Sequence, residues 1–290
     1  MTAPPVSGFT LVRNAIRLDF PVEASIRSIL PLCDEVVVNV GKSDDDTLDL
    51  IMGIGDPRIR VIESEWDFSG DYHVLADETQ RAMNACRHSW GIYIQGDEVL
   101  HHDGIPVLRD AIARHDGNSA VEGLLLRYRH FYGTPDYLAT SRGWYPYEVR
   151  VVRLGDKWGI HSYRDAQGFR VGTDERKIRV KRTEAWIHHY GWARPDPALV
   201  EKAKTHPRIY GGAVPEDLQT VRLAWQPGIG RYSGTHPETV TDWVAQRRGV
   251  LEDRVLPQEW SWQYLRHYAS AMVERVTGRR PFEFRNYRVV

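Results

Sequence analysis

Two adjacent acids, Asp97 and Glu98, follow a glycine directly after the apolar run "WGIYIQ" at residues 90–95. Apolar residues at the end of a buried strand exclude water and hold the backbone, so acids placed there are well positioned. Adjacent carboxylates also repel each other unless a cation or a proton intervenes. The pattern therefore predicts a metal-binding turn with Asp97 as a ligand, and an ordinary solvated turn is the alternative. Glu98 could point away from Asp97 and brace the turn.

A histidine doublet, His188-His189, lies in a second apolar run at residues 184–192. Successive side chains of a strand face opposite sides, so at most one of the two rings can reach a given metal ion. The alternative for each ring is a buried histidine that a backbone carbonyl satisfies. His101 and His102, just after the acidic turn, are expected at the surface.

The first hundred residues alternate between strand-like and helix-like segments, which must position these groups. Strand patterns fall at residues 9–15, 34–41, 58–64 and 90–95, with helical patterns between them. This rhythm predicts right-handed crossovers and a mostly parallel sheet. Ligands of such sheets bind beyond the carboxyl ends of the strands. Polar residues gather at that predicted edge, at 13–14, 39–46 and 95–98.

The rest of the chain changes character. Strand-like segments at 121–133, 147–154 and 184–192 predict an antiparallel extension of the same sheet. After Pro195 and Pro197 the chain turns helical, with an apolar stripe closed by Gly278 that consists of Leu265, Ala269, Met272 and Val276. We therefore expect a catalytic domain at 1–194, with halves 1–100 and 101–194, and a helical extension at 195–290 that packs on it through this stripe.

Composition excludes several classes of protein. The 290 residues are 42% hydrophobic, and 38 Lys and Arg balance 39 Asp and Glu, so no global field marks a nucleic-acid binder. The N-terminus lacks the features of a signal peptide and no apolar run approaches the length of a membrane span, so a cytoplasmic location is expected. Cys33 and Cys86 fit buried small hydrophobes better than a disulfide.

Two common phosphate-binding motifs are absent. Gly41-Lys42-Ser43 would need a glycine at the position of Val36 to form a P-loop. The first strand leads into "RNAIRLDF", which has no glycines to let a pyrophosphate approach the backbone as in a dinucleotide-binding fold. What remains is a nucleotide site without a glycine-rich loop, in which a metal ion carries the diphosphate.

Several segments, in order, resemble one enzyme family. They are "RNA" after the first strand, "VVVNVGKSDDDTLDLI", "IQGDEVL", "DAQGFR", "HHYGW", "SGTHPE" and "FRNYRVV". The chain is similar to family 2 glycosyltransferases with the GT-A fold, and most closely to a bacterial and phage subgroup. The resemblance implies an α/β fold and the transfer of a sugar from a nucleoside-diphosphate donor to a hydroxyl acceptor, with inversion and with Mn²⁺ or Mg²⁺ as cofactor.

The chain departs from the family at two positions. Gln95 stands at the first acid of the family's DxD metal motif, and Asn39 stands where the family usually has an Asp that holds the nucleobase or ribose. An amide brings no charge to a metal, so a metal-independent enzyme remains open. These departures also leave open a non-catalytic nucleotide-binding or glycan-binding module. A nucleotidyltransferase is a weaker alternative, since it would need a basic glycine-rich first loop.

The resemblance assigns the metal to Asp97 and His189, because His189 aligns with the subgroup's "HYGW". Position at the strand ends, or on the helix before the acidic turn, marks the donor contacts Arg13, Asn14, Asn39, Asp44, Asp46, Gln80, Gln95 and Asp97. The predicted general base is Asp165, with Glu148 as second candidate. A salt bridge to Arg164 or Arg170 is the alternative for Asp165, and a helix cap at Thr47 is the alternative for Asp46.

The predicted partners are a nucleotide sugar and an acceptor. Aromatic and histidine side chains that could form an acceptor platform, or simply pack the core, are Tyr128, His130, Tyr132, Trp144 and Tyr145. The acceptor could be a glycan, a lipid, a protein or a modified DNA base, and the sequence does not choose among them.

Overall fold

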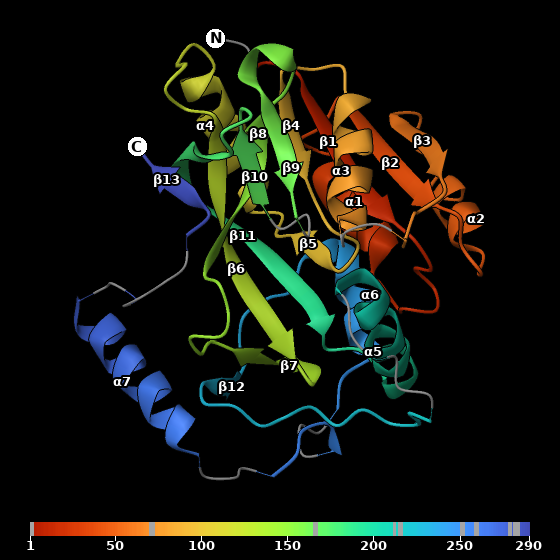
Figure 1. Cartoon of the computed structure of the whole chain (residues 1–290), viewed down its shortest axis with the longest axis vertical. Coiled ribbons are helices and arrows are strands. Elements are labelled where there is room, and N and C mark those ends of the chain that lie inside the picture. Colours follow the sequence, from red (N-terminus) through yellow and green to blue (C-terminus); the bar gives the residue numbers. More distant parts are fainter. Residues whose placement is uncertain are drawn as a thin grey trace.

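The core of the molecule is a curved sheet that runs through both halves of the chain (Figure 1). The computed structural model describes residues 3–69, 73–164, 168–210, 213, 217–249, 253–257, 261–277, 280 and 285–290. The main strand order is β3-β2-β1-β4-β8-β6-β11-β10-β9. The predicted α/β class is confirmed, with a parallel first half and an antiparallel continuation.

The parallel half comes from the first hundred residues. Its strands are β1 (Val6–Val12), β2 (Glu35–Gly41), β3 (Ile59–Ser64) and β4 (Trp90–Tyr93), and its helices are α1 (Val22–Ile29), α2 (Thr47–Met52) and α3 (Val74–Asn84). All neighbouring pairs among these four strands are parallel.

Helices cover both faces of this half. The alternation of β2 sends Val36 and Val38 toward α1 and α2, and Val37 toward α3. The first strand ends earlier than predicted, because Asn14 has a φ of 52° and turns the chain out of the sheet. This turn leaves Arg13 and Asn14 at the carboxyl end of β1.

The second half contains β5 (Glu98–Leu100), α4 (Gly104–His115), β6 (Gly123–Tyr132), β7 (Thr134–Ala139), β8 (Tyr147–Arg153), the 3₁₀ helix η1 (Asp156–Trp158), β9 (Ile160–Tyr163), β10 (Gly168–Val171) and β11 (Arg176–Trp192). The predicted antiparallel pairing holds where β8 lies between β4 and β6. One pair differs, since β6 and β11 are parallel. Strand β11 is also longer than the predicted segment, and it pairs with β5, β6 and β10 along its length.

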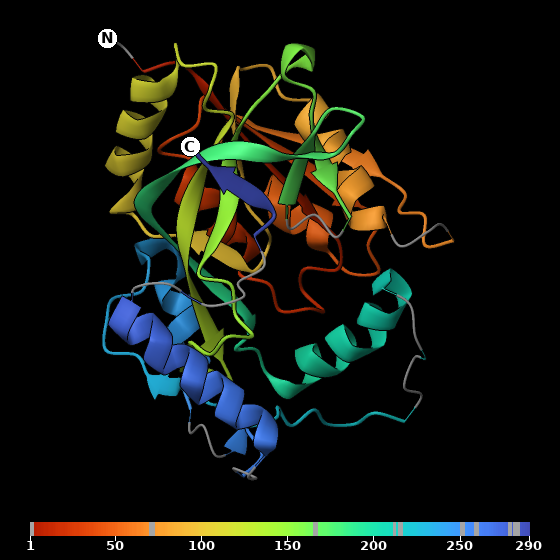
Figure 2. The same cartoon turned by 60° about the vertical axis from the view of Figure 1, so that its left-hand side comes forward.

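The last hundred residues contain α5 (Asp196–Tyr210), β12 (Ile229–Arg231), the 3₁₀ helix η2 (Glu238–Val240), α6 (Thr241–Ala245), α7 (Trp262–Thr277) and β13 (Tyr287–Val289). Two of these elements join the sheet, because β12 pairs with β7 and β13 pairs with β11. Helices α5 and α7 both lie at the end of the molecule away from the N-terminus (Figure 2). The division into 1–194 and 195–290 stays a prediction.

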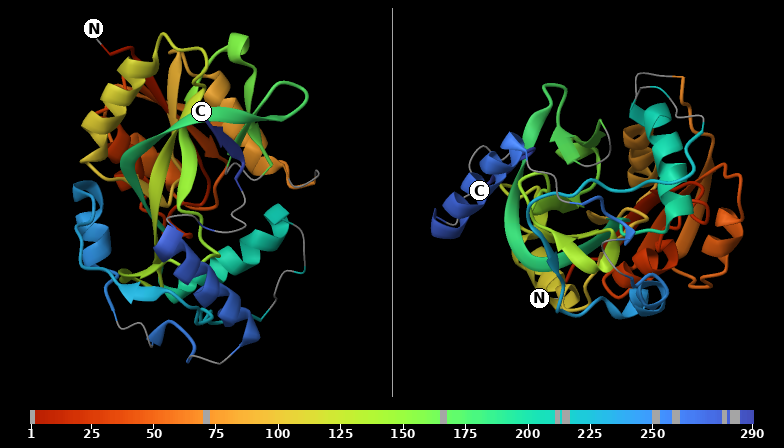
Figure 3. Two further views of the ribbon diagram at one scale, coloured as in Figure 1. Left: turned by 90° about the vertical axis from the view of Figure 1, so that its left-hand side faces the viewer. Right: turned by 90° about the horizontal axis from the view of Figure 1, so that it is seen from below.

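The predicted packing of the α7 stripe is wrong. Leu265, Met272 and Val276 are 47%, 70% and 80% exposed, and Ala269 is exposed as well. Helix α7 lies at the edge of the molecule (Figure 3) and is held by polar contacts instead, such as the hydrogen bond from the Tyr264 hydroxyl to the carbonyl of Trp225. Periodicity identified the helix correctly, but it did not identify the face that touches the protein.

Candidate functional site

A cavity of about 470 Å³ opens at the carboxyl ends of β1 and β4, where the strand order predicts ligand binding. The turn after β4, strand β11 and helix α5 also contribute walls. The polar residues that line it are Arg13, Asn14, Gln95, Asp97, His189, Arg194, Lys202, Thr205 and His206, and its aromatic residues include Phe20, Trp66, Phe68, Tyr93, Trp144, Tyr145, Trp192 and Tyr210.

The cavity brings together half of the described residues that were predicted to contact the donor or the metal or to act as the base. Arg13, Asn14, Gln95, Asp97 and His189 line it. The others among the described residues do not line it; these are Asn39, Asp44, Asp46, Gln80 and Glu148. Asp165 lies outside the described residues.

Asp97 is the centre of a charged group. Its Oδ2 lies 3.7 Å from Nε2 of His189 and 3.9 Å from Nη2 of Arg194. Burial alone would raise the pKa of Asp97, but the neighbouring His189, Arg194 and Lys202 outweigh it and hold the pKa well below its usual range. Gly191 permits this approach, because a Cβ there would lie 2.8 Å from Oδ2 of Asp97 and 2.6 Å from Nε2 of His189.

Glu98 braces the turn instead of facing the cavity. Its carboxylate is fully buried and accepts two hydrogen bonds from Arg150, at 2.8 and 2.9 Å. The Tyr128 hydroxyl donates a third at 2.8 Å, and the backbone N–H of Gln95 donates a fourth at 3.2 Å. The adjacent acids thus separate, one into an ion pair of the core and one into the cavity.

The adjacent histidines lie on opposite faces of β11, as predicted. His188 is fully buried among Phe131, Tyr190 and His236, and its Nε2 lies 3.0 Å from Nη1 of Arg129. His189 lines the cavity and faces Asp97. Nδ1 of His189 lies 2.9 Å from Nδ1 of a further histidine, His130.

The carboxyl end of β1 is held by a small polar network. Arg13 donates through Nε to the carbonyl of Lys42 at 2.8 Å and pairs with Asp44 at 3.3 Å. The Asn14 side chain donates to Asp44 at 3.2 Å and accepts from its backbone N–H at 2.8 Å. Asp44 therefore holds Arg13 and Asn14 in place from behind the cavity wall.

The structure places Asn39 in the core and not at the cavity. Its amide donates to a carboxylate oxygen of Glu78 at 2.7 Å and accepts from the Ser64 hydroxyl at 2.9 Å, so it holds α3 and β3 against β2. Gln80 similarly accepts from the backbone N–H of Ser162 at 2.8 Å and holds α3 against β9. Their hydrogen-bonding groups are used inside the protein.

Asp46 is the N-cap residue of α2, but its exposed side chain makes no capping hydrogen bond. Asp45 does so instead, because its carboxylate accepts from the backbone N–H of Thr47 at 3.1 Å. The loop "DDD" thus contains one acid that stabilises the helix start and one, Asp44, that positions the cavity wall.

Helix α5 supplies residues that the sequence reasoning missed, since the site was expected to end at "HHYGW". Lys202 donates to the carbonyl of Gly191 at 2.9 Å, and its Nζ lies 3.8 Å from the centre of the Trp192 ring. Burial and the charge of Arg194 lower the pKa of Lys202 to about 7. The spacing of the α5 lining residues, Lys202, Thr205, His206, Ile209 and Tyr210, follows one helix face and could have revealed them.

A second missed group forms an aromatic wall after β3. Trp66 and Phe68 have ring centres 6.2 Å apart, and the Arg13 guanidinium lies 5.3 Å from the centre of the Phe68 ring. Nε1 of Trp66 is buried and has no hydrogen-bond partner among the described residues. The flat aromatic surfaces of this wall suit a planar ligand.

Glu148, the second candidate base, lies in β8 and is 7% exposed. Burial raises the pKa of Glu148 to about 7, against the opposing charge of Arg150. Its described side-chain partner is Asn286, which donates to its carboxyl at 3.4 Å. This raised pKa suits a general base near neutral pH, but the carboxyl of Glu148 does not line the cavity.

A larger cavity of about 720 Å³ lies beside β11 and β13, away from Asp97. Its lining is Arg176, Lys177, Arg179, Arg285, Tyr287, Arg288 and Val289. Two of these, Arg176 and Arg179, pair with the buried carboxylate of Glu122. Since its described lining contains no carboxylate or histidine, it offers neither acid-base groups nor metal ligands, and we take the smaller cavity as the candidate active site.

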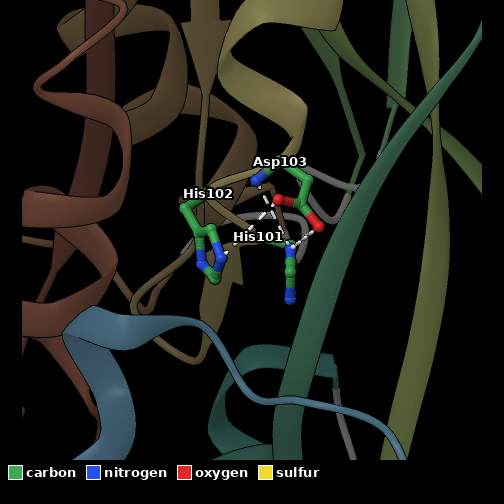
Figure 4. A group of neighbouring side chains, drawn as sticks. All are labelled: His101, His102 and Asp103. Carbon is green, nitrogen blue, oxygen red and sulfur yellow. Dashed lines mark hydrogen bonds and ion pairs between the residues drawn. The ribbon is translucent and has the colours of Figure 1, made fainter.

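His101, His102 and Asp103 are the one group of three possible metal ligands found within 4.8 Å of each other in the described part of the chain (Figure 4). They do not line the cavity. The prediction that His101 is at the surface is wrong, because it is 5% exposed and its Nε2 lies 3.2 Å from the Thr235 hydroxyl. His102 and Asp103 are exposed, which leaves this group at the surface without a cavity.

Comparisons with known proteins give little further support. No family model matches the chain, and no curated protein matches it. Among solved structures, S. aureus TarS 1-349 is similar over 43% of this chain and 36% of its own length, with 19% identity and a TM-score of 0.35. S. aureus TarS 1-349 in complex with UDP-GlcNAc covers 44% and 35%, with the same identity and TM-score. The match thus spans about a third of the length of that chain.

Among the helices that the structure describes, none has the length and apolar character needed to cross a membrane.

Proposed function

We propose that this chain is a glycosyltransferase that moves a sugar from a nucleoside-diphosphate donor to a hydroxyl acceptor, with inversion. The observation that supports it most is the cavity itself. It combines the Asp97 and His189 pair with the cations Arg13 and Lys202 and with aromatic walls, at the edge of the sheet where nucleotides bind. The sequence resemblance to family 2 glycosyltransferases points to the same edge.

Asp97 and His189 fit a divalent cation. Their Oδ2 and Nε2 atoms are 3.7 Å apart and both residues line the cavity. Mn²⁺ and Mg²⁺ commonly take one or two protein ligands and complete their shell with substrate phosphates and water. Arg194 does not block this arrangement, because it donates to the carbonyls of Leu18 and Gly191. When bound, the ion would neutralise charge that develops on the leaving diphosphate.

The protein's own cations and rings would bind the rest of the donor. Lys202 and Arg13 lie on different walls of the cavity and supply positive charge for the phosphates. Trp66 and Phe68 supply flat apolar surfaces for a nucleobase. Asn14, fixed by Asp44, is the neighbouring polar contact for the ribose or sugar.

Inverting transfer needs a base for the acceptor hydroxyl. The acceptor oxygen attacks the anomeric carbon, the bond from that carbon to the diphosphate breaks, and the hydroxyl proton passes to the base. We propose Asp165 for this role and Glu148 as the second candidate. The acceptor itself, a glycan, a lipid, a protein or a modified DNA base, would enter along the wall formed by Trp144 and Tyr145.

The test is turnover of UDP, GDP, TDP and CDP sugars with and without Mn²⁺, measured as release of the nucleoside diphosphate. One donor should be hydrolysed slowly, and Asp97→Asn should remove the Mn²⁺-dependent part while the chain stays folded. Asp103→Asn, an exposed acid outside the cavity, is the matched control and should leave turnover unchanged. Equal turnover by the wild type and Asp97→Asn would rule out the proposed role of Asp97.

A non-catalytic nucleotide-binding or glycan-binding module is the second candidate. One observation favours it: among the described residues that line the cavity, Asp97 is the single carboxylate, and it sits among cations. Such a module would bind a nucleoside diphosphate without hydrolysing or transferring any sugar. The same turnover panel, combined with a binding measurement, separates the two.

A further inference from the structure

His130, a buried residue of β6, links His189 to the wall of the cavity. It is 3% exposed, and its ring packs against Tyr128, Trp144 and Tyr145. Its Nδ1 lies 2.9 Å from Nδ1 of His189, and its Nε2 lies 2.7 Å from the carbonyl oxygen of Tyr145. The three groups therefore form a hydrogen-bonded chain from the cavity wall to His189.

The carbonyl fixes where the hydrogens lie in this chain. A carbonyl oxygen only accepts hydrogen bonds, so Nε2 of His130 must carry a hydrogen. The ring is buried among Tyr128, Trp144 and Tyr145, and such apolar surroundings disfavour a charged imidazolium. A neutral His130 with a hydrogen on Nε2 has a lone pair on Nδ1. His189 must then donate its Nδ1 hydrogen to that lone pair.

In a neutral His189, the form that binds a metal ion, this arrangement leaves Nε2 without a hydrogen. That atom faces Oδ2 of Asp97 at 3.7 Å, so two acceptors point at one another across the cavity wall. Two acceptors repel each other unless a cation lies between or beside them. A metal-binding histidine commonly donates its other ring N–H to an acceptor that fixes its tautomer and orientation.

We propose that His130 is a positioning residue that holds His189 in the tautomer and orientation needed to bind a divalent cation together with Asp97. This inference rests on the proposed function, because it concerns the same metal site. His130 touches neither donor nor metal, and it acts only through His189. Because this series of hydrogen bonds ends at the carbonyl of Tyr145, it connects the metal site to the wall where the acceptor would enter.

The first test reads the tautomers directly in the wild-type chain. The protein would be labelled with ¹⁵N at its histidines, freed of metal with EDTA and studied by NMR at pH 8.5, where exposed histidines are neutral. We expect His189 to carry its hydrogen on Nδ1 and His130 on Nε2, with the signals assigned from His130→Asn and His189→Gln. A hydrogen on Nε2 of His189 would overturn the proposal.

The second test measures binding of Mn²⁺ alone, from the electron paramagnetic resonance signal of the free ion. His130→Phe keeps a buried ring but offers no acceptor, and it should weaken Mn²⁺ binding about 10-fold to 100-fold. In His130→Asn the amide oxygen can accept from His189, so affinity should stay within about 3-fold of the wild type. As a control, His188→Phe makes the same histidine-to-phenylalanine change at a buried ring that does not contact His189, and it should leave Mn²⁺ affinity unchanged.

The outcomes separate this inference from the proposed function. Mn²⁺ affinity unchanged in a folded His130→Phe would overturn the role of His130 and leave the metal site standing. A wild-type chain that binds no Mn²⁺ would overturn both. Circular dichroism checks the fold of each variant, and if His130→Phe does not fold, the tautomers of the wild type and the affinity of His130→Asn decide.

Discussion

The cavity and the core of this protein each contain one acid and one histidine from the same two short sequence pairs. Each of the pairs Asp97-Glu98 and His188-His189 sends one member to the cavity and one to the core. In the core, Glu98 is fully paired with Arg150, and His188 is enclosed by aromatic rings. On the cavity side, Asp97 and His189 keep atoms that a ligand can reach. The comparison teaches that the face of the element, and not the residue type, separates a structural acid or histidine from a candidate functional one.

The largest effect on stability should come from breaking the buried ion pair between Glu98 and Arg150. Glu98→Gln would leave the Arg150 guanidinium buried without its counter-charge, and breaking a buried pair in this way costs about 3–5 kcal/mol. Urea unfolding should show the larger loss in Glu98→Gln and a smaller loss in Asp97→Asn, because the basic partners of Asp97 lie farther away, at 3.7 and 3.9 Å. Similar losses in the two variants would show that the adjacent acids do not differ as described.

Glu148 is a second buried acid, and it lacks the two hydrogen bonds from an arginine that Glu98 accepts. Burial raises the pKa of Glu148 to about 7 from an ordinary value of 4.5. The folded chain therefore binds more protons than the unfolded chain between these values, so raising the pH from 4.5 to 7 favours unfolding. At about 1.4 kcal/mol per pH unit, this group removes about 3 kcal/mol of stability across that range.

Glu148→Gln should be free of that loss, so its stability relative to the wild type should rise by about this amount from pH 4.5 to pH 7. Urea unfolding of both proteins at several pH values measures the difference. A difference that stays constant with pH would mean that the carboxyl of Glu148 titrates normally in the folded chain.

The histidine doublet tests the cavity side. His189→Ala should weaken Mn²⁺-dependent binding of a nucleoside diphosphate by about 10-fold to 100-fold, because it removes a metal ligand. His188→Ala should lower the melting temperature through lost packing and leave that binding unchanged. Calorimetric titration and thermal melts of both variants separate the effects. Equal effects on binding would favour a packing role for both rings.

The smallest effect concerns the wall that α5 adds to the cavity. Lys202→Met keeps the apolar stem against Trp192 and removes the charge, so nucleoside-diphosphate affinity should fall by about 10-fold. Lys204→Met, on the same helix but outside the cavity lining, is the control. Titration at pH 6, below the lowered pKa of Lys202, should give the clearest contrast. Unchanged affinity in Lys202→Met would remove α5 from the binding site.

The sequence predicted the parallel half well because its signals are local. The alternation of Val36, Val37 and Val38 gives a strand covered on both faces, and the polar turn at Gln95 to Asp97 follows directly from the end of an apolar run. Strand geometry alone also placed the two histidines of β11 on opposite faces. Five of the ten predicted donor and metal contacts and base candidates that the structure describes line the cavity.

The rest depends on contacts between segments far apart in the chain. Nothing near Asn39 shows that Glu78 and Ser64 will satisfy its amide, and nothing near Lys202 shows that α5 will fold back over Asp97. The stripe of α7 shows the limit of periodicity, since Met272 and Val276 lie on the expected helix and face solvent. Spacing along the chain gives the element and its faces, but the partner of each face is a property of the whole fold.

One measurement tests the central claim, that Asp97 and His189 bind a divalent cation together with a nucleoside diphosphate. Calorimetric titration of the wild-type chain with UDP, GDP, TDP and CDP, with and without Mn²⁺, measures the coupling between the two ligands. We predict that Mn²⁺ strengthens binding of at least one nucleoside diphosphate by 10-fold or more, and that this ligand strengthens Mn²⁺ binding by the same factor, as thermodynamic linkage requires. Nucleoside-diphosphate binding that Mn²⁺ leaves unchanged, or no binding of any of the four, would contradict the account.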